Sequence, residues 1–151
     1  MIFGRTLEDT NLAKEILQRL KNKEVSLDEL TAEEVETLER GTITVNTLNR
    51  IENKISELKT RYLDMGYFVG NLQIKNWSNG GEFKANDFER ILDNINALRE
   101  AYYVYLTTPR TPSASYRVKN INDIEQILDD LDGMIDDVAL YTPECGNAYC
   151  G

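Results

Sequence analysis

Five aspartates crowd a short stretch of the chain, and carboxylates at that density could bind calcium. They surround Gly133, at Asp129, Asp130, Asp132, Asp136 and Asp137. A calcium loop has glycine at its sixth position and needs oxygen ligands at its first and twelfth positions. With Gly133 in sixth place, those positions fall on Leu128 and Ala139, whose side chains carry no oxygen. The pattern therefore favours the solvated polar face of a helix over a metal site.

Two cysteines, Cys145 and Cys150, are the other reactive groups that stand out. Zinc takes four ligands, and because the chain has no histidine, carboxylates or a second chain would have to supply the other two. The pair could instead form a small disulfide loop or remain as exposed free thiols. Free thiols are the favoured interpretation, and the disulfide is the main alternative.

Common catalytic motifs are missing from the sequence. It has no histidine, phosphate-binding glycine loop, nucleophile elbow or Cys-x-x-Cys pair, so the commonest general base and metal ligand are unavailable. We expect no enzyme activity, no cofactor and no metal. The formal net charge of −9 argues against nucleic acid as a partner, because binding it needs clustered Lys and Arg. No apolar run reaches the roughly 20 residues of a membrane helix, and no apolar signal core follows Met1, so we expect neither a membrane partner nor secretion.

The strongest pattern is a segment that recurs three times at intervals of roughly 40 residues, as in helical arrays. Each copy starts with asparagine, followed by Thr or Asp and then an apolar residue; the three asparagines are Asn46, Asn86 and Asn122. Asparagine favours helix starts because its side-chain oxygen accepts from a free amide of the first turn. Glu89 and Glu125 stand three positions later, at the spacing of a capping box. We expect the three asparagines to cap three long helices.

Apolar residues follow each asparagine at alternating intervals of three and four, the spacing of helices that pack side by side. The three series are Leu48, Ile51, Ile55, Leu58, Tyr62 and Met65; Phe88, Ile91, Ile95, Leu98, Tyr102 and Tyr105; and Ile124, Ile127, Leu131, Met134, Val138 and Tyr141. The charged residues Glu52 and Lys59 flank the first apolar series and make the apolar face of that helix narrow. Leu128 and Ile135 flank the third series and make its apolar face wide. We therefore expect the third helix to be the most enclosed, and the first to lie at an edge or to face a partner.

Two shorter helices are expected before the repeat. Apolar spacing predicts one near 7–21, and the capping-box spacings at 26–29 and 31–34 predict a second that ends at Gly41. Loop-forming residues mark irregular linkers at 66–81 and 107–115. The sequence thus predicts one all-α domain over 1–151, a helical bundle of three long capped helices with two shorter N-terminal helices and irregular linkers. The short helices would occupy about 7–40, the repeat core about 46–141 and a flexible tail 142–151.

Aromatic residues concentrate at Trp77 and in the stretch 102–105. Their simplest role is to fill the core and to anchor loops. The alternative is an interface anchor, because Tyr and Trp are enriched in protein contacts. Tyr103 lies off the apolar series, so it is the best candidate for an exposed contact, with Trp77 as the second.

Several local strings together resemble a known family. They are Arg5, Thr6 and Asp9 near the start, the segment 48–52 (Leu-Asn-Arg-Ile-Glu), the segment 122–128, and a Cys-Gly…Tyr-Cys-Gly ending. They are similar to small proteins and domains encoded in the tail modules of phages and prophages of Firmicutes. That family usually carries Glu after each Cys-Gly, whereas Asn147 follows the first one here.

The resemblance implies a structural part of a virion, in the tail, baseplate or fibre attachment. Its partners would be other phage tail proteins, and it would be a homo-oligomer or be present in several copies per particle. The alternative is a small acidic regulatory protein that binds and sequesters one protein partner, because negative charge on a helical scaffold steers association with a basic protein.

Overall fold

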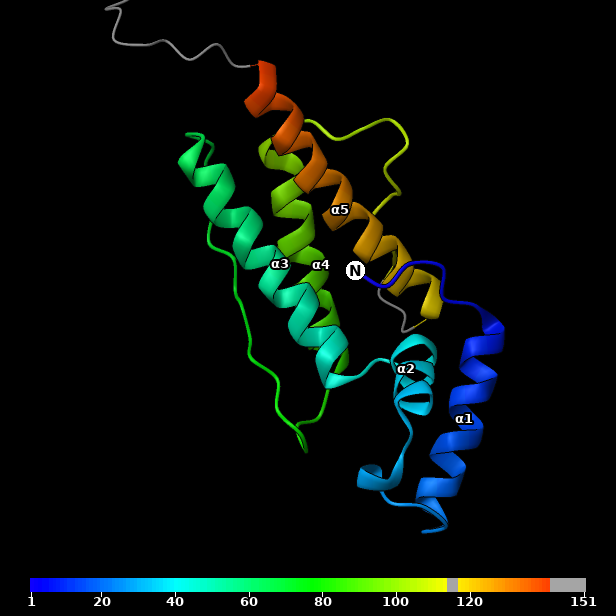
Figure 1. The fold of residues 1–151 in the computed structure, drawn as a ribbon. Coiled ribbons are helices and arrows are strands. Elements are labelled where there is room, and N and C mark those ends of the chain that lie inside the picture. Colours follow the sequence, from blue (N-terminus) through cyan, green and yellow to red (C-terminus); the bar gives the residue numbers. More distant parts are fainter. Residues whose placement is uncertain (114–116, 142–151) are drawn as a thin grey trace, which may run out of the picture.

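The computed structural model describes residues 1–113 and 117–141, and within these ranges every regular element is a helix. The order is α1 (Leu7–Lys21), the short 3₁₀ helix η1 (Leu27–Glu29), α2 (Ala32–Gly41), α3 (Val45–Asp64), α4 (Ala85–Ala101) and α5 (Val118–Tyr141) (Figure 1). The prediction of an all-α fold is confirmed for this part of the chain. None of these helices is long and apolar enough to span a membrane.

The helices α3, α4 and α5 lie side by side and point in the same direction (Figure 1). Ion pairs between α3 and α5 agree with this direction, because Arg50 contacts Glu125 and Arg61, further along α3, contacts Asp136. A chain that builds parallel helices must return along their length, which is about 30 Å for 20 residues. Residues 65–84 make the first return as an extended segment beside α3. The irregular linker expected at 66–81 lies in this segment.

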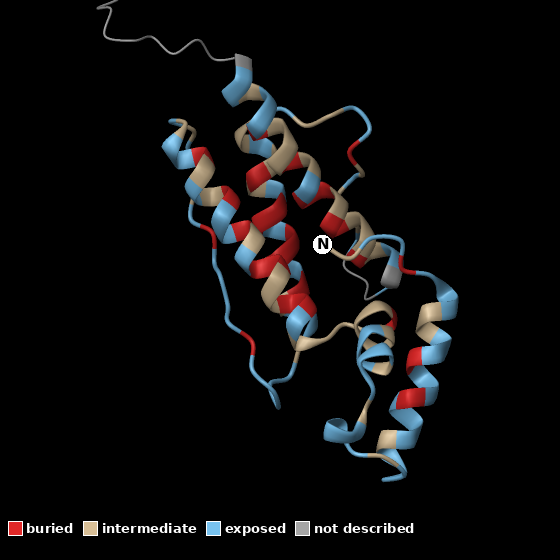
Figure 2. Ribbon diagram, viewed as in Figure 1, coloured by how far each residue is buried: buried red, intermediate tan, exposed pale blue. Residues whose placement is uncertain are grey.

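The facing sides of α3, α4 and α5 hold the main hydrophobic core (Figure 2). Most positions of the three apolar series are buried there, as the helical spacing predicts. These buried residues are Leu48, Ile51, Ile55, Leu58 and Tyr62 on α3, Phe88, Ile91, Ile95 and Leu98 on α4, and Ile124, Ile127 and Leu131 on α5.

The second apolar series does not continue as a helix, which corrects the expectation for Tyr102 and Tyr105. α4 ends at Ala101, and Tyr102 has extended backbone angles (φ −155°, ψ −174°). Residues 102–105 are all aromatic or β-branched and therefore weaker helix formers. The Tyr102 ring packs on Tyr67 with 4.7 Å between centroids, and the Tyr105 hydroxyl donates a hydrogen bond to Asp137. Both side chains thus find partners outside a helix.

The apolar series of α3 is buried along most of its length, so the expected place at an edge is not observed, and the alternative that α3 faces a partner stays a prediction. Ile55 of α3 and Leu131 of α5 are both 0% exposed. Glu52, one of the two charged residues beside this series, is itself fully buried, because Arg90 of α4 pairs with it and the extended segment 65–84 donates hydrogen bonds to it. The side chain of Glu52 therefore lies in a second buried contact beside the apolar series and not in solvent.

The prediction that Asn46, Asn86 and Asn122 cap the long helices is wrong, because each lies inside its helix. α3 begins after Thr44, whose hydroxyl accepts a hydrogen bond from the N–H of Thr47 at 3.1 Å. Threonine caps by the same mechanism as asparagine, so a better-placed capping residue starts the helix two positions earlier. α4 and α5 likewise begin before their asparagines, so Glu89 and Glu125 are not partners in capping boxes.

The side chain of Asn122 instead binds the backbone of the N-terminal segment. Its side-chain amide accepts from the N–H of Arg5 at 3.2 Å and donates to the carbonyl of Arg5 at 2.9 Å. Asn49 of α3 binds the N–H and carbonyl of Trp77 in the same way, at 2.8 and 3.0 Å. Extended segments need partners for their buried backbone groups, and these helical asparagines take the place of a neighbouring strand.

The helices α1 and α2 form an antiparallel pair at one end of the molecule, joined through η1 (Figure 1). Thr6 and Thr31 cap them with complete capping boxes, so the predicted helix near 7–21 and the helix ending at Gly41 are confirmed. The close approach of the two helices depends on Gly41. A Cβ atom there would lie 2.1 Å from the carbonyl oxygen of Asp9 and 2.5 Å from the Cβ of Ala13.

Replacing Gly41 by alanine is expected to push α1 and α2 apart and to lower the free energy of unfolding by about 1–3 kcal/mol, the usual cost of overpacking. The nearest obstacle is backbone, which cannot rotate away. Gly133→Ala is the matched control, because the nearest atom to a Cβ there is the Tyr105 hydroxyl at 3.5 Å. That substitution lies inside α5 and should raise stability by about 0.5–1 kcal/mol. Urea unfolding of both variants measures the difference, and equal stabilities would contradict this account of Gly41.

Candidate functional site

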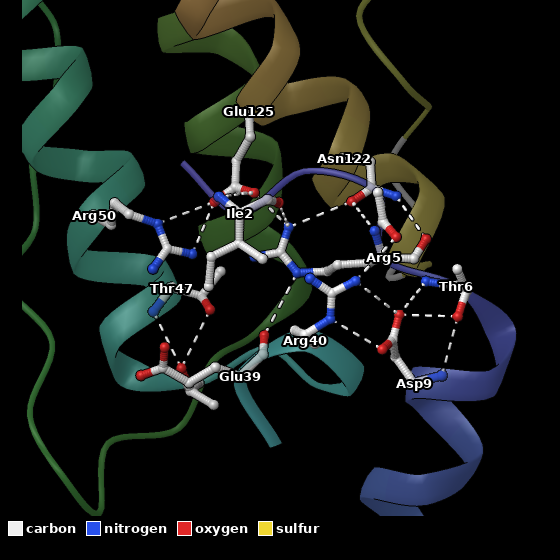
Figure 3. Close-up of polar contacts among 12 residues, drawn as sticks. Ile2, Arg5, Thr6, Asp9, Glu39, Arg40, Thr47, Arg50, Asn122 and Glu125 are labelled. Atoms are coloured by element: carbon white, nitrogen blue, oxygen red, sulfur yellow. Dashed lines mark hydrogen bonds and ion pairs between the residues drawn. The ribbon is translucent and has the colours of Figure 1, made fainter. Parts of the chain in front are cut away.

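A buried ion network joins the α1–α2 pair to α3 and α5 (Figure 3). Its centre is Arg5, on the extended segment before α1, whose side chain is only 1% exposed. The Arg5 guanidinium pairs with Glu125 of α5, donates to the carbonyl of Ile2 at 2.7 Å, and reaches the carbonyl of Glu39 at the end of α2. One arginine thus contacts both units of the molecule.

Glu125 is the acceptor on which this network converges. Its side chain is 0% exposed and binds Arg5 on one side and Arg50 of α3 on the other, the latter at 2.8 and 3.1 Å. The backbone N–H of Ile2 also donates to it, at 3.2 Å. A buried carboxylate requires such partners, because an unpaired charge inside a protein is costly. Its oxygens are therefore occupied by structural contacts, and its role is to hold three segments together.

Beside this network, Arg40 of α2 binds Asp9 of α1 at 3.0 Å (Figure 3). This bond and the N–H of Thr6 lower the pKa of Asp9 below its ordinary value of 3.8. The N–H of Thr31, followed by Arg19, lowers the pKa of Glu34 below its ordinary value of 4.5. These carboxylates favour the folded α1–α2 pair only while they are ionised.

We expect the α1–α2 pair to lose stability in acid. A lowered folded-state pKa means that the unfolded chain binds protons first, so the contribution is complete above the ordinary values of 3.8 and 4.5 and is lost as the pH falls through the lowered ones. Urea unfolding at several pH values between 7 and 2, followed by circular dichroism, measures this loss. Asp9→Asn should flatten part of the dependence, whereas Glu100→Gln on the exposed side of α4 should leave it unchanged.

A second buried carboxylate, Glu52 of α3, organises the extended segment 65–84. It pairs with Arg90 of α4 and accepts hydrogen bonds from the Trp77 indole N–H at 3.3 Å and from the backbone N–H of Lys75 at 3.4 Å. Asn94 of α4 fastens the same segment through the N–H and carbonyl of Gln73, at 3.1 and 2.8 Å.

This arrangement decides between the two interpretations of Trp77. The side chain is 7% exposed and packs edge-on against Phe83, with 5.3 Å between ring centroids. Its indole N–H is held by Glu52 and its backbone by Asn49. Trp77 therefore anchors the loop to the core, and the alternative that it is an exposed interface anchor is wrong.

The aspartates around Gly133 lie on a continuous helix, because α5 runs from Val118 to Tyr141 without interruption. Asp132 binds Lys54 of α3 at 2.7 Å, and Asp132 and Asp136 both pair with Arg61. The hydrogen bond from Tyr105 to Asp137 raises the pKa of Tyr105 to about 12, because ionisation would break it. A continuous helix excludes the loop geometry of a calcium site, and no group of three metal-ligating side chains occurs among the described residues.

Tyr103 is exposed, as the sequence predicts, with 76% of its surface open to solvent. Because α3, α4 and α5 run in parallel, their carboxyl-terminal ends lie at the same end of the molecule (Figure 1). Other large exposed apolar residues occur at or just beyond these helix ends. We call this set the apolar end; it comprises Leu63, Phe68, Tyr103, Leu106 and Leu140.

Side-chain contacts join the segments that follow α3 and α4 to each other and to the end of α5. The Tyr102 ring packs at a tilt on Tyr67 and edge-on against Tyr103, with centroids 4.7 and 5.3 Å apart, and the first of these contacts links the residues after α3 to those after α4. The hydrogen bond from Tyr105 to Asp137 links the segment after α4 to the last turns of α5. Phe68 is 83% exposed despite its size. Large apolar side chains exposed in this way are suited to contact another protein.

The remaining predicted site residues, Cys145 and Cys150, and the expected tail 142–151 lie outside the described residues. Arg5, Glu125 and Glu52, by contrast, were not identified as buried ion pairs from the sequence. The only sequence signal for such a buried ion pair is a charged residue at a position within an apolar series, and this signal exists for Glu52 and Glu125.

Comparison with protein-family models, with curated proteins and with solved structures found no match to this chain.

Proposed function

We propose that this protein is a structural adaptor that works by packing against other proteins, as a tail, baseplate or fibre-associated component of a phage virion. The observation that carries the proposal is the apolar end, the set of large apolar side chains, Phe68 and Tyr103 among them, that stand exposed near the carboxyl-terminal ends of three parallel helices. Large apolar side chains exposed at one end of a polar protein are suited to a contact with another protein, and aromatic residues are enriched in such contacts. The proposed placement in a phage tail is supported by the family resemblance of the sequence.

The arrangement of the helices supports an adaptor in particular. The apolar end and the α1–α2 pair lie at opposite ends of the molecule (Figure 1). We expect α3, α4 and α5 to act as one three-helix bundle, a rigid spacer between two contact surfaces. Such a part would be present in several copies in the particle, in contact with other tail proteins and with copies of itself.

Mass spectrometry of purified virions tests this function. The chain should be found in particles of the phage or prophage that encodes it, at a stoichiometry set by the symmetry of the tail. The double variant Phe68→Ser and Tyr103→Ser should be depleted from particles. Leu7→Ser is the matched control, because Leu7 is 75% exposed but lies on α1. Absence of the wild-type chain from intact particles would refute the proposal.

The net charge of −9 favours the alternative of a small acidic regulator that sequesters one basic protein. Light scattering at several concentrations separates the two functions, because an adaptor with an open apolar end should self-associate. A monomer at every concentration that is absent from particles and captures one soluble protein would support the regulator.

A further inference from the structure

The α1–α2 pair carries a second surface that the apolar end does not explain. A hollow of about 280 Å³ lies between the two helices, with Leu12 and Ile16 of α1 in its lining. Leu12 is 45% exposed although it faces the neighbouring helix. A second hollow, of about 570 Å³, begins at Leu20 and is lined by Val25 and Leu27. Within the described chain, nothing covers either hollow.

The two hollows follow one stripe of α1. Leu12, Ile16 and Leu20 are spaced four residues apart, so they lie on one face and span about 12 Å along the axis. Apolar residues on one face of an amphipathic helix have the same spacing, about 5–6 Å between neighbours. A second helix laid along this stripe would therefore place successive apolar side chains in successive hollows. Such helix-in-groove binding is a common form of peptide recognition.

The charged side chains that line the two hollows indicate which charge a bound helix should carry. Glu15 of α1 and Glu33 of α2 line the first hollow and make no ion pair with the described residues. The third carboxylate there, Glu34, is already paired with Arg19 at 2.5 Å. Lys23 and Glu29 both line the second hollow, so its charged residues balance and it adds no net charge to the groove. The unpaired charge at the first hollow is therefore negative, and lysine or arginine beside the apolar side chains of a partner would complement it.

From these observations we infer that the α1–α2 groove binds a basic amphipathic helix of a partner protein, with apolar anchors in the two hollows and cations against Glu15 and Glu33. This site is separate from the apolar end and goes beyond the proposed function. It assigns a partner of defined chemistry to the opposite end of the molecule.

The test uses the full chain and two synthetic 18-residue helices that differ only in their polar face. Both carry leucine at amphipathic spacing; one has lysine and the other glutamate on the polar face. Fluorescence anisotropy measures binding at low salt and at physiological salt. The lysine peptide should bind more than about tenfold tighter than the glutamate peptide. A scrambled lysine peptide of the same composition, which is not amphipathic, should bind weakly.

Three variants locate the binding. Leu12→Ser and the double variant Glu15→Lys and Glu33→Lys should each weaken binding of the lysine peptide by about tenfold or more. Glu100→Lys, on the exposed side of α4, makes a similar change of charge away from the groove and should have little effect. Circular dichroism confirms that each variant is folded, which is expected because all four positions are exposed.

Equal binding of the two peptides, no effect of Leu12→Ser, or an equal effect of Glu100→Lys would overturn the inference. Self-association of the chain that Leu12→Ser abolishes would overturn it too, because the occupant would then be a second copy. Incorporation into virions is measured separately with the apolar-end variants, so the groove can fail while the structural function stands.

Discussion

Replacing Glu125 by alanine is expected to lower the free energy of unfolding by about 3–5 kcal/mol, the cost of breaking a buried ion pair from one side. The carboxylate is 0% exposed and has two arginine partners. Its removal leaves both guanidinium groups without their carboxylate partner and the N–H of Ile2 without this acceptor. Because the partners come from the N-terminal segment and α3, the loss should also loosen the α1–α2 pair from the long helices.

The matched control is Glu57→Ala, because Glu57 is also on a long helix and also ion-paired, but its side chain is 55% exposed. Exposed pairs contribute about 0–1 kcal/mol, so this change should be nearly neutral. Arg5→Met should cost less than Glu125→Ala, since Arg50 would still neutralise Glu125 and the unpaired Nη2 atom of Arg5 would disappear. Urea unfolding measures all three, and limited proteolysis of the N-terminal segment reports its release. A Glu125 variant as stable as the Glu57 variant would contradict the assignment.

Local patterns in the sequence predict the helices and their buried faces. An apolar residue every three or four positions is sufficient to orient Ile51, Ile95 and Ile127 inward, because a helix in contact with others has one buried stripe. The capping-box spacings at 26–29 and 31–34 are also confirmed, because that interaction depends on residues three positions apart. The off-series position of Tyr103 correctly predicts its exposure.

Long-range arrangement could not be predicted in the same way. Nothing local states that α3, α4 and α5 point in one direction, and the apolar end exists only because they do. Phe68 and Leu106 follow two of these helices and look, in sequence, like any apolar linker residue. Glu125 has the spacing of a cap partner, yet its acceptor atoms serve Arg5, which lies 120 residues away. Which charges pair across such distances depends on topology, and one sequence does not contain that information explicitly.

Gly41 and Asn122 both have long-range partners that their local sequence does not indicate. Gly41 ends α2, as expected, but its lack of a side chain also permits contact with α1. Asn122 was expected to satisfy free amides of its own helix, and it satisfies the backbone of Arg5 instead. In both cases the tertiary structure, and not the neighbouring sequence, determines which group the residue contacts.

Replacing Glu52 by alanine is the second change expected to have a large effect, again of about 3–5 kcal/mol. It would leave Arg90, the Trp77 indole and the N–H of Lys75 without their common acceptor in a site where Glu52 is 0% exposed. The consequence should differ from that of Glu125→Ala, because the released element is the extended segment 65–84. Trp77 is the only tryptophan in the chain, so its fluorescence reports this segment directly.

In the Glu52→Ala variant we expect the emission of Trp77 to shift to longer wavelength and to become accessible to iodide, at temperatures where the far-ultraviolet circular dichroism still shows helix. Glu125→Ala should leave the emission close to that of the wild type under the same conditions, which makes each variant the control for the other. Glu52→Gln keeps the shape and one acceptor oxygen, so it should have a smaller effect than alanine, because a neutral amide satisfies Arg90 only in part. If Trp77 remained shielded in Glu52→Ala while unfolding became easier everywhere, Glu52 would support the core as a whole, and the extended segment would be held by Asn49 and Asn94.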